Sequence, residues 1–122
     1  MFKPYFTFAE LIHTDQKMDN VPTTLEQVNN LLCLGFILQD IREEFGYPIK
    51  VNSAFRTKQV NDAVGGVDNS YHLRGRAADI RPVRQAGVDF NQNLSKLVSI
   101  VKQYEDVLTE LIIYPTFIHI AI

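Results

Sequence analysis

Tryptophan is absent from this chain of 122 residues, and cysteine occurs once, at Cys33. A single thiol excludes an internal disulfide, so packing has to hold the fold together. Cys33 lies within the apolar run 31–34, and we expect it to be a small buried hydrophobic residue.

Long apolar runs and basic blocks are also missing. Because no stretch of 18 apolar residues occurs, the sequence predicts no membrane-spanning helix. The 12 basic and 14 acidic residues form no basic block, which argues against nucleic acid as a partner. Residues 1–8 lack the apolar core and the small-residue cleavage site of a signal peptide. We therefore expect no signal peptide and a cytoplasmic location at synthesis, with any export following another route.

The apolar residues that are present suffice for a core. They make up 46% of the chain and include eight Phe and five Tyr. The length suits one domain, and no repeat or flexible linker divides the sequence. We expect a single domain over residues 1–122.

Local patterns predict both helices and strands. The pairs Thr7 with Glu10 and Thr23 with Glu26 have the spacing of capping boxes, and Gly46 ends the main helix. The expected helices span residues 8–12, 24–45, 57–64 and 91–104. The expected strands span residues 49–52, 77–80, 110–114 and 117–122. This content indicates an α+β fold, with a small antiparallel sheet and helices packed on one side.

Main-helix residues that recur at helical spacing, and that we expect to face inward, are Leu25, Val28, Leu31, Leu32, Leu34, Leu38, Ile41 and Phe45. The last two strands read as a hairpin with Pro115 in its turn.

Three side chains are candidates for a metal site. His72 and Asp79 flank Gly75, whose conformational freedom allows a tight turn between them. By this spacing alone, a surface His and a solvated Asp remain the alternative. His119 lies in an otherwise apolar strand, where a buried imidazole needs a polar partner. Two imidazoles and one carboxylate form a common ligand set for catalytic Zn²⁺, with the fourth position open to water.

Four blocks of the chain carry a family resemblance. They are Ser53-Ala-Phe-Arg56, Asn61-Asp-Ala-Val-Gly-Gly66, Asn69-Ser-Tyr-His-Leu-Arg-Gly-Arg-Ala-Ala-Asp-Ile80 and Phe117-Ile-His-Ile120. In this order they resemble the zinc D-Ala-D-Ala carboxypeptidase-like metallopeptidases, which are peptidoglycan peptidases of the Hedgehog/DD-peptidase fold. The resemblance extends over about residues 6–122.

The resemblance implies a role for each matching residue. His72, Asp79 and His119 would be the ligands of Zn²⁺. Arg56 would steady the carbonyl or carboxylate of the substrate and stabilise the oxyanion that forms there. Ser70 matches a serine that contacts the substrate.

The chain departs from the family at the general acid/base. Family members carry an Asp or Glu shortly before the last ligand, often three positions upstream, where this chain has Thr116. Family acids on the preceding strand fall near Thr109 and Tyr114, which are not acids either. In an active enzyme, another carboxylate therefore has to act as the general acid/base.

Glu110 is the nearest carboxylate to the last ligand in the expected hairpin, and Asp106 is a weaker candidate. If Tyr114 pairs with Phe117, Glu110 becomes the diagonal neighbour of His119 on one face of the hairpin. We therefore predict that Glu110 is the catalytic acid/base, against the alternative of a solvated carboxylate at the sheet edge.

Together these features predict a zinc-dependent peptidase that hydrolyses a bond next to a D-amino acid in bacterial peptidoglycan. It would be a DD- or LD-carboxypeptidase or an endolysin-like endopeptidase, with a peptidoglycan stem peptide as its partner. One alternative is a catalytically inactive zinc domain that serves structure or peptidoglycan binding. Another is a structural module without metal. The sequence does not indicate an oligomeric state.

Overall fold

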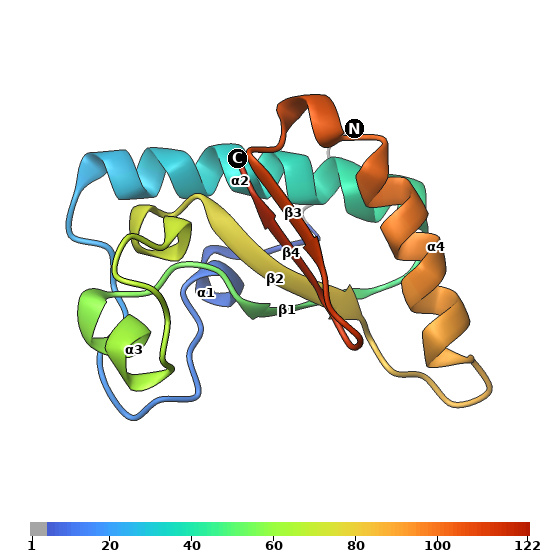
Figure 1. Cartoon of the computed structure of the whole chain (residues 1–122), viewed down its shortest axis with the longest axis horizontal. Coiled ribbons are helices and arrows are strands. Elements are labelled where there is room, and N and C mark those ends of the chain that lie inside the picture. The colour runs from blue at the N-terminus through green and yellow to red at the C-terminus, as the bar shows by residue number, and fades with distance from the viewer. Residues whose placement is uncertain (1–4) are drawn as a thin grey trace.

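The computed structural model describes residues 5–122. Residues 1–4 lie outside this range. They form half of the segment, residues 1–8, on which the expectation of no signal peptide is based. The helices are α1 (Phe8–Leu11), α2 (Leu25–Phe45), α3 (Lys58–Ala63) and α4 (Phe90–Lys102), with 3₁₀ helices η1 (Tyr71–Arg74) and η2 (Glu105–Val107). The strands are β1 (Ile49–Ser53), β2 (Ala77–Pro82), β3 (Glu110–Ile113) and β4 (Ile118–Ala121) (Figure 1). Each predicted helix and strand is present, with ends shifted by at most two residues.

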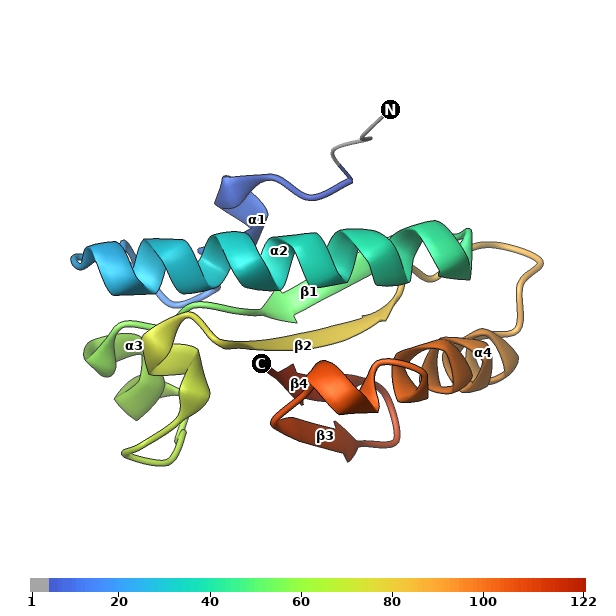
Figure 2. The same ribbon diagram turned by 90° about the horizontal axis from the view of Figure 1, so that it is seen from above.

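The strands form one antiparallel sheet in the order β1-β2-β4-β3. Figure 2 shows the strands in this order, with α2 running along the sheet beside β1. Side chains of α2 and α4 pack against the same sheet face, as the shared core demonstrates. The predicted α+β class is therefore confirmed.

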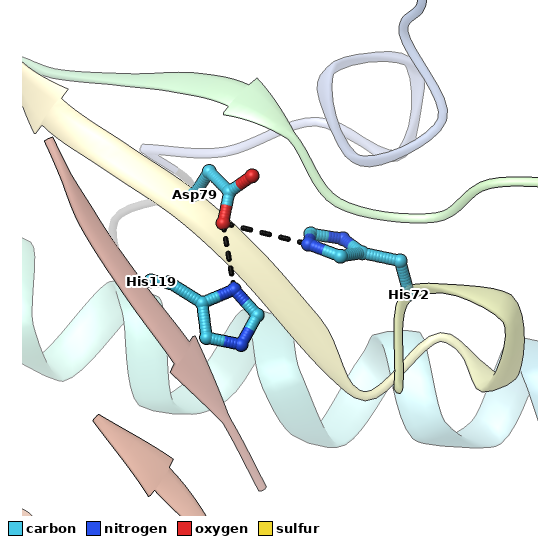
Figure 3. A group of neighbouring side chains, drawn as sticks. All are labelled: His72, Asp79 and His119. Atoms are coloured by element: carbon cyan, nitrogen blue, oxygen red, sulfur yellow. Dashed lines mark hydrogen bonds and ion pairs between the residues drawn. The ribbon is translucent and has the colours of Figure 1, made fainter. Parts of the chain in front are cut away.

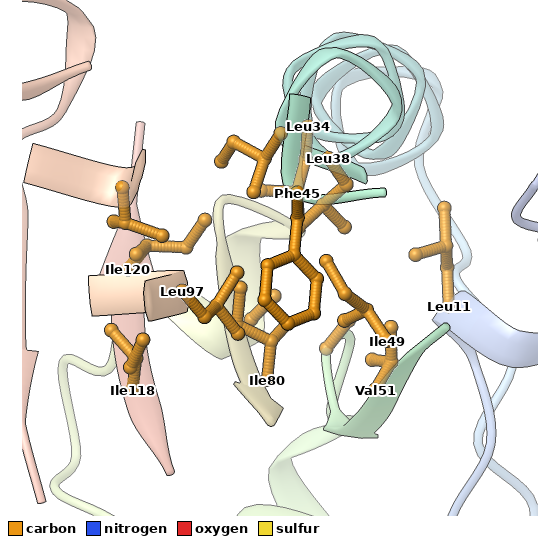
Figure 4. Packing of buried hydrophobic residues seen from close by; sticks show 14 of the residues in the cluster. Leu11, Leu34, Leu38, Phe45, Ile49, Val51, Ile80, Leu97, Ile118 and Ile120 are labelled. Carbon is orange, nitrogen blue, oxygen red and sulfur yellow. The ribbon is translucent and has the colours of Figure 1, made fainter. Parts of the chain in front are cut away.

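Strand alternation separates the core from the opposite face of the sheet. Ile80 of β2 and Ile118 and Ile120 of β4 are fully buried against the helices (Figure 4). Asp79 lies between the buried residues Ala78 and Ile80, and His119 lies between Ile118 and Ile120, so the side chains of Asp79 and His119 leave the sheet on the other face. The same two strands thus build the core and carry two of the predicted ligands.

The capping box of α2 begins one residue later than predicted. Thr24 is the N-cap: its hydroxyl accepts a hydrogen bond from the Gln27 amide, and the Gln27 side chain accepts one from the Thr24 amide. The Gln27 amide group also donates to the carbonyl of Leu73, which ties the start of α2 to η1. Glu26, the acid in the predicted box, takes no part in the cap, and its carboxylate instead lies 3.5 Å from Nη2 of Arg74 in η1. Gly46 ends the helix at φ +81°, as expected.

The prediction that Cys33 is buried is wrong, because its side chain is exposed. Leu25 and Leu32 are 75% and 54% exposed, although we expected them to face inward. Apolar residues lie on more than one side of α2, and the spacing alone does not determine which stripe meets the sheet. Within residues 5–122, no helix is long and apolar enough to cross a membrane.

The C-terminal hairpin has the predicted register. Glu110 pairs with Ala121, and Ile112 pairs with His119. The amide of Tyr114 donates to the carbonyl of Phe117 and closes the turn. Glu110 is therefore the diagonal neighbour of His119, as the pairing argument required.

Truncation of the core face of β4 tests this arrangement. We expect Ile120→Ala to lower the free energy of unfolding by about 2–5 kcal/mol, because it opens a cavity at a fully buried site. Urea denaturation measures this loss. Ile113→Ala is the matched control, since Ile113 of β3 is 48% exposed, and its cost is expected to stay below about 1 kcal/mol. Equal losses in the two variants would contradict the placement of Ile120 in the core.

Candidate metal centre

His72 of η1, Asp79 of β2 and His119 of β4 converge (Figure 3), although His119 follows Asp79 by 40 residues in the sequence. Their potential ligand atoms all lie within 4.8 Å of one another. Asp79 Oδ1 is at the centre, 2.8 Å from His119 Nδ1 and 3.4 Å from His72 Nε2. The three side chains that the sequence singled out therefore meet at one point.

The turn before β2 fixes the position of His72. Ser70 caps η1, and its hydroxyl accepts a hydrogen bond from the His72 amide. Gly75 ends η1 at φ +73°, and a Cβ there would lie 2.7 Å from the carbonyl oxygen of Gln27. The His72 ring is almost fully buried, and its Nδ1–H donates to the carbonyl of Ala54. This hydrogen bond leaves Nε2 directed at Asp79.

The other two ligand candidates are placed by strand pairing. Asp79 of β2 lies directly opposite His119 of β4 on the face away from the helices. The far nitrogen of the imidazole, Nε2, lies 2.8 Å from Glu110 Oε1. Both nitrogens of His119 therefore contact carboxylate oxygens, an arrangement that a doubly protonated imidazolium satisfies when no metal is bound.

These contacts determine the charge of the cluster. Burial raises the pKa of Asp79, but hydrogen bonds from His119 and His72 outweigh it and hold that pKa well below its usual range. Burial lowers the pKa of His119, but the hydrogen bonds to Asp79 and Glu110 outweigh it and leave the pKa raised. The cluster therefore keeps an ionised carboxylate in a half-buried site that attracts a cation.

Arg56 lies beside the cluster and is held from three directions. Its Nε donates to Ser53 Oγ, its Nη1 to Asn61 Oδ1 and its Nη2 to Asp79 Oδ2, at 3.1, 3.3 and 3.4 Å. Asn61 is itself buried, and a Cβ at Gly66 would lie 2.0 Å from its Oδ1. The absence of a side chain at position 66 thus makes room for the amide that holds the guanidinium.

All six predicted site residues line one open cleft of about 1060 Å³. They are Arg56, Ser70, His72, Asp79, Glu110 and His119. Residues 64–74 form one wall, and the β3–β4 hairpin contributes the other. Asp106 and Thr116 do not line this cleft. Asp106 lies exposed on η2.

A comparison with known families agrees with this geometry. A family model described as peptidase M15 matches residues 4–121 of the chain. The chain belongs to the peptidase M15 family. This membership confirms the resemblance that the four sequence blocks carried.

A curated relative of this M15 chain is the zinc D-Ala-D-Ala carboxypeptidase of Streptomyces albus G. The two are 38% identical over 78 residues. The match covers 62% of this chain but 30% of the relative, so the M15 chain corresponds to less than a third of that protein.

The donor set of the M15 chain suits Zn²⁺. Two imidazole nitrogens and one carboxylate oxygen are typical of catalytic zinc sites, which keep a further position open. Each imidazole also has a partner on its other nitrogen, the Ala54 carbonyl for His72 and the Glu110 carboxylate for His119. Such partners orient metal-binding rings in proteins.

Several contributors to this M15 site were not predicted as such from the sequence. Asn61 lies in one of the resembling blocks, but its contact with Arg56 follows from the fold. The Ala54 carbonyl carries no side-chain signal at all. Tyr114 and Phe117 stack at 4.6 Å between ring centroids and line the cleft near the hairpin turn. Their shared face follows from the hairpin register, which the sequence did predict.

Zinc binding is expected to weaken as the pH falls. Zn²⁺ needs neutral imidazoles, and the raised pKa of His119 means that a proton competes for this ligand to a higher pH than for a free histidine. Affinity should therefore fall as the pH is lowered through the raised pKa of His119, and the loss should begin at a higher pH than for a free histidine. Competition with a coloured chelator measures it.

The control is His13→Ala, which removes an exposed imidazole paired with Asp15 outside the cleft. This variant should show the pH dependence of the unchanged protein. Equal zinc affinity at pH 7.5 and pH 5.5 would contradict ligation by His119.

Proposed function

We propose that this chain is a zinc-dependent peptidase that hydrolyses a peptide bond next to a D-amino acid in bacterial peptidoglycan. The observation that carries the proposal is the convergence of His72 Nε2, Asp79 Oδ1 and His119 Nδ1 at an open cleft. Membership of the M15 family and the name of the carboxypeptidase relative support the same chemistry. The class of bond, in a DD- or LD-carboxypeptidase or an endolysin-like endopeptidase, is part of the proposal.

His72, Asp79 and His119 are the proposed ligands of Zn²⁺. When bound, this ion supplies Lewis acidity and makes water nucleophilic near neutral pH. The side chains are already oriented for ligation, because strand pairing and the Ala54 carbonyl fix them. Little rearrangement is therefore needed for binding.

Arg56 is the proposed anchor for the substrate. Its contacts with Ser53, Asn61 and Asp79 involve three of the five N–H donors of a guanidinium. The remaining donors belong to Nη1 and Nη2, and we assign them to the carbonyl or terminal carboxylate of the peptide. A guanidinium held in this way stabilises negative charge that develops on the carbonyl oxygen.

Ser70 and the hairpin aromatics complete the proposed substrate site. The oxygen of Ser70 accepts from the His72 amide, and its hydroxyl proton can still be donated to a peptide carbonyl. Tyr114 and Phe117 offer an apolar surface on the opposite wall. A stem peptide would lie between these walls.

Glu110 is the proposed general acid/base. It lines the cleft and keeps 38% of its side chain exposed. Its Oε1 contacts His119, and we assign to Oε2 the transfer of a proton from water to the leaving amine.

A second candidate function follows from the hairpin turn. Thr116 lies where family members often carry the acid, and its hydroxyl cannot act as a general acid/base near neutral pH. This difference favours a zinc domain that binds peptidoglycan without cleaving it.

Incubation of the zinc-loaded protein with purified peptidoglycan distinguishes the two functions. We expect mass spectrometry to detect D-alanine or stem-peptide fragments, and we expect His72→Ala to release none because it lacks one ligand. Co-sedimentation of zinc-loaded protein with peptidoglycan, without release of fragments, would instead support the binding function. If the protein neither binds peptidoglycan nor releases fragments from it, both proposed functions are contradicted.

The role of Glu110 in turnover is tested by Glu110→Gln. An amide cannot accept the proton, so the turnover number should fall by about 10²–10⁴-fold. Zinc content, measured by atomic absorption, should be unchanged. The control is Glu105→Gln, on an exposed residue of η2. Turnover of Glu110→Gln at the level of this control would refute proton transfer by Glu110.

A further inference from the structure

We propose that Glu110 is also a positioning residue, which holds the His119 ring in the tautomer that presents Nδ1 to the metal. This inference rests on the proposed zinc site and assigns to Glu110 a function separate from proton transfer. Its Oε1 lies 2.8 Å from Nε2 of His119, while Nδ1 of the same ring lies 2.8 Å from Asp79 Oδ1. The two nitrogens thus face different carboxylates.

The contact with Glu110 influences which nitrogen of the His119 ring carries the proton. A neutral imidazole carries one proton, on either Nδ1 or Nε2, and only the unprotonated nitrogen binds a metal. A carboxylate accepts hydrogen bonds, so Glu110 stabilises the form with the proton on Nε2. In that form the lone pair of Nδ1 points towards Asp79 Oδ1, the atom that His72 Nε2 also approaches.

Each of the two histidines has a hydrogen-bond acceptor at one ring nitrogen, and this nitrogen is Nδ1 in His72 but Nε2 in His119. The Nδ1–H of His72 donates to the Ala54 carbonyl, which leaves Nε2 for the metal. For His119, the acceptor lies on Nε2 and leaves Nδ1. An acceptor on the far nitrogen fixes both the tautomer and the orientation of a metal-binding ring.

The register of the hairpin explains why Glu110 fills this role. Ile112 lies directly opposite His119 on β3 and has no side-chain acceptor. Glu110 is two residues earlier on the same face and pairs with Ala121, whose small side chain leaves room for the carboxylate to turn towards the ring. The hydrogen bond therefore crosses the hairpin diagonally.

Zinc affinity of three variants tests the proposal. We expect Glu110→Ala to weaken zinc binding by about 10- to 100-fold, the usual effect of removing such a partner. Glu110→Gln keeps an acceptor oxygen at the same position, so its affinity should lie closer to that of the unchanged protein. Glu105→Ala removes an exposed carboxylate from η2 and is the matched control. Circular dichroism confirms folding before each titration.

A spectroscopic measurement on the unchanged protein gives an independent test. Long-range ¹H–¹⁵N correlation spectra of the zinc-loaded protein should show the His119 proton on Nε2. A proton on Nδ1 would overturn the proposal, as would Glu110→Ala with the zinc affinity of the Glu105→Ala control. Glu110→Gln as weak as Glu110→Ala would overturn the hydrogen-bond account. Failure of the unchanged protein to bind zinc would instead count against the proposed function.

Discussion

Successive side chains of β2 point to opposite faces of the sheet, and this alternation links the stability of the fold to the geometry of the site. Ala78 and Ile80 enter the core, while Asp79 between them faces the cleft. Burial of a side chain such as Ile80 contributes about 1.5–3 kcal/mol. The core thereby fixes the backbone that carries Asp79, so the carboxylate stays in place although burial alone disfavours its charge.

Much of the site was predictable because the strand period is two. Once Tyr114 is paired with Phe117, the alternation places Glu110 and His119 on one face, and the structure has this register. The turn at Gly75 was also predictable, since glycine adopts its positive φ without strain. Local rules were sufficient here because each depends on neighbours in sequence or on one strand pairing.

Other features depend on tertiary structure. Which stripe of α2 meets the sheet decides the exposure of Cys33 and Leu32, and the helical period does not contain that information. The N-cap of α2 is Thr24 rather than Thr23, in a helix start where Gln27 also contacts the carbonyl of Leu73. The acceptor for His72 is a backbone carbonyl, which any residue type would supply.

The pairing of β4 has a consequence for how the chain tolerates insertions and deletions. A one-residue change of length between Ile118 and Ala121 would exchange the two faces of the following residues, so that an imidazole would enter the core or an isoleucine the cleft. A two-residue change returns the following side chains to their original faces. Natural variation in the length of this strand should therefore occur in steps of two residues, and this constraint comes from the alternation of the whole strand rather than from any single residue.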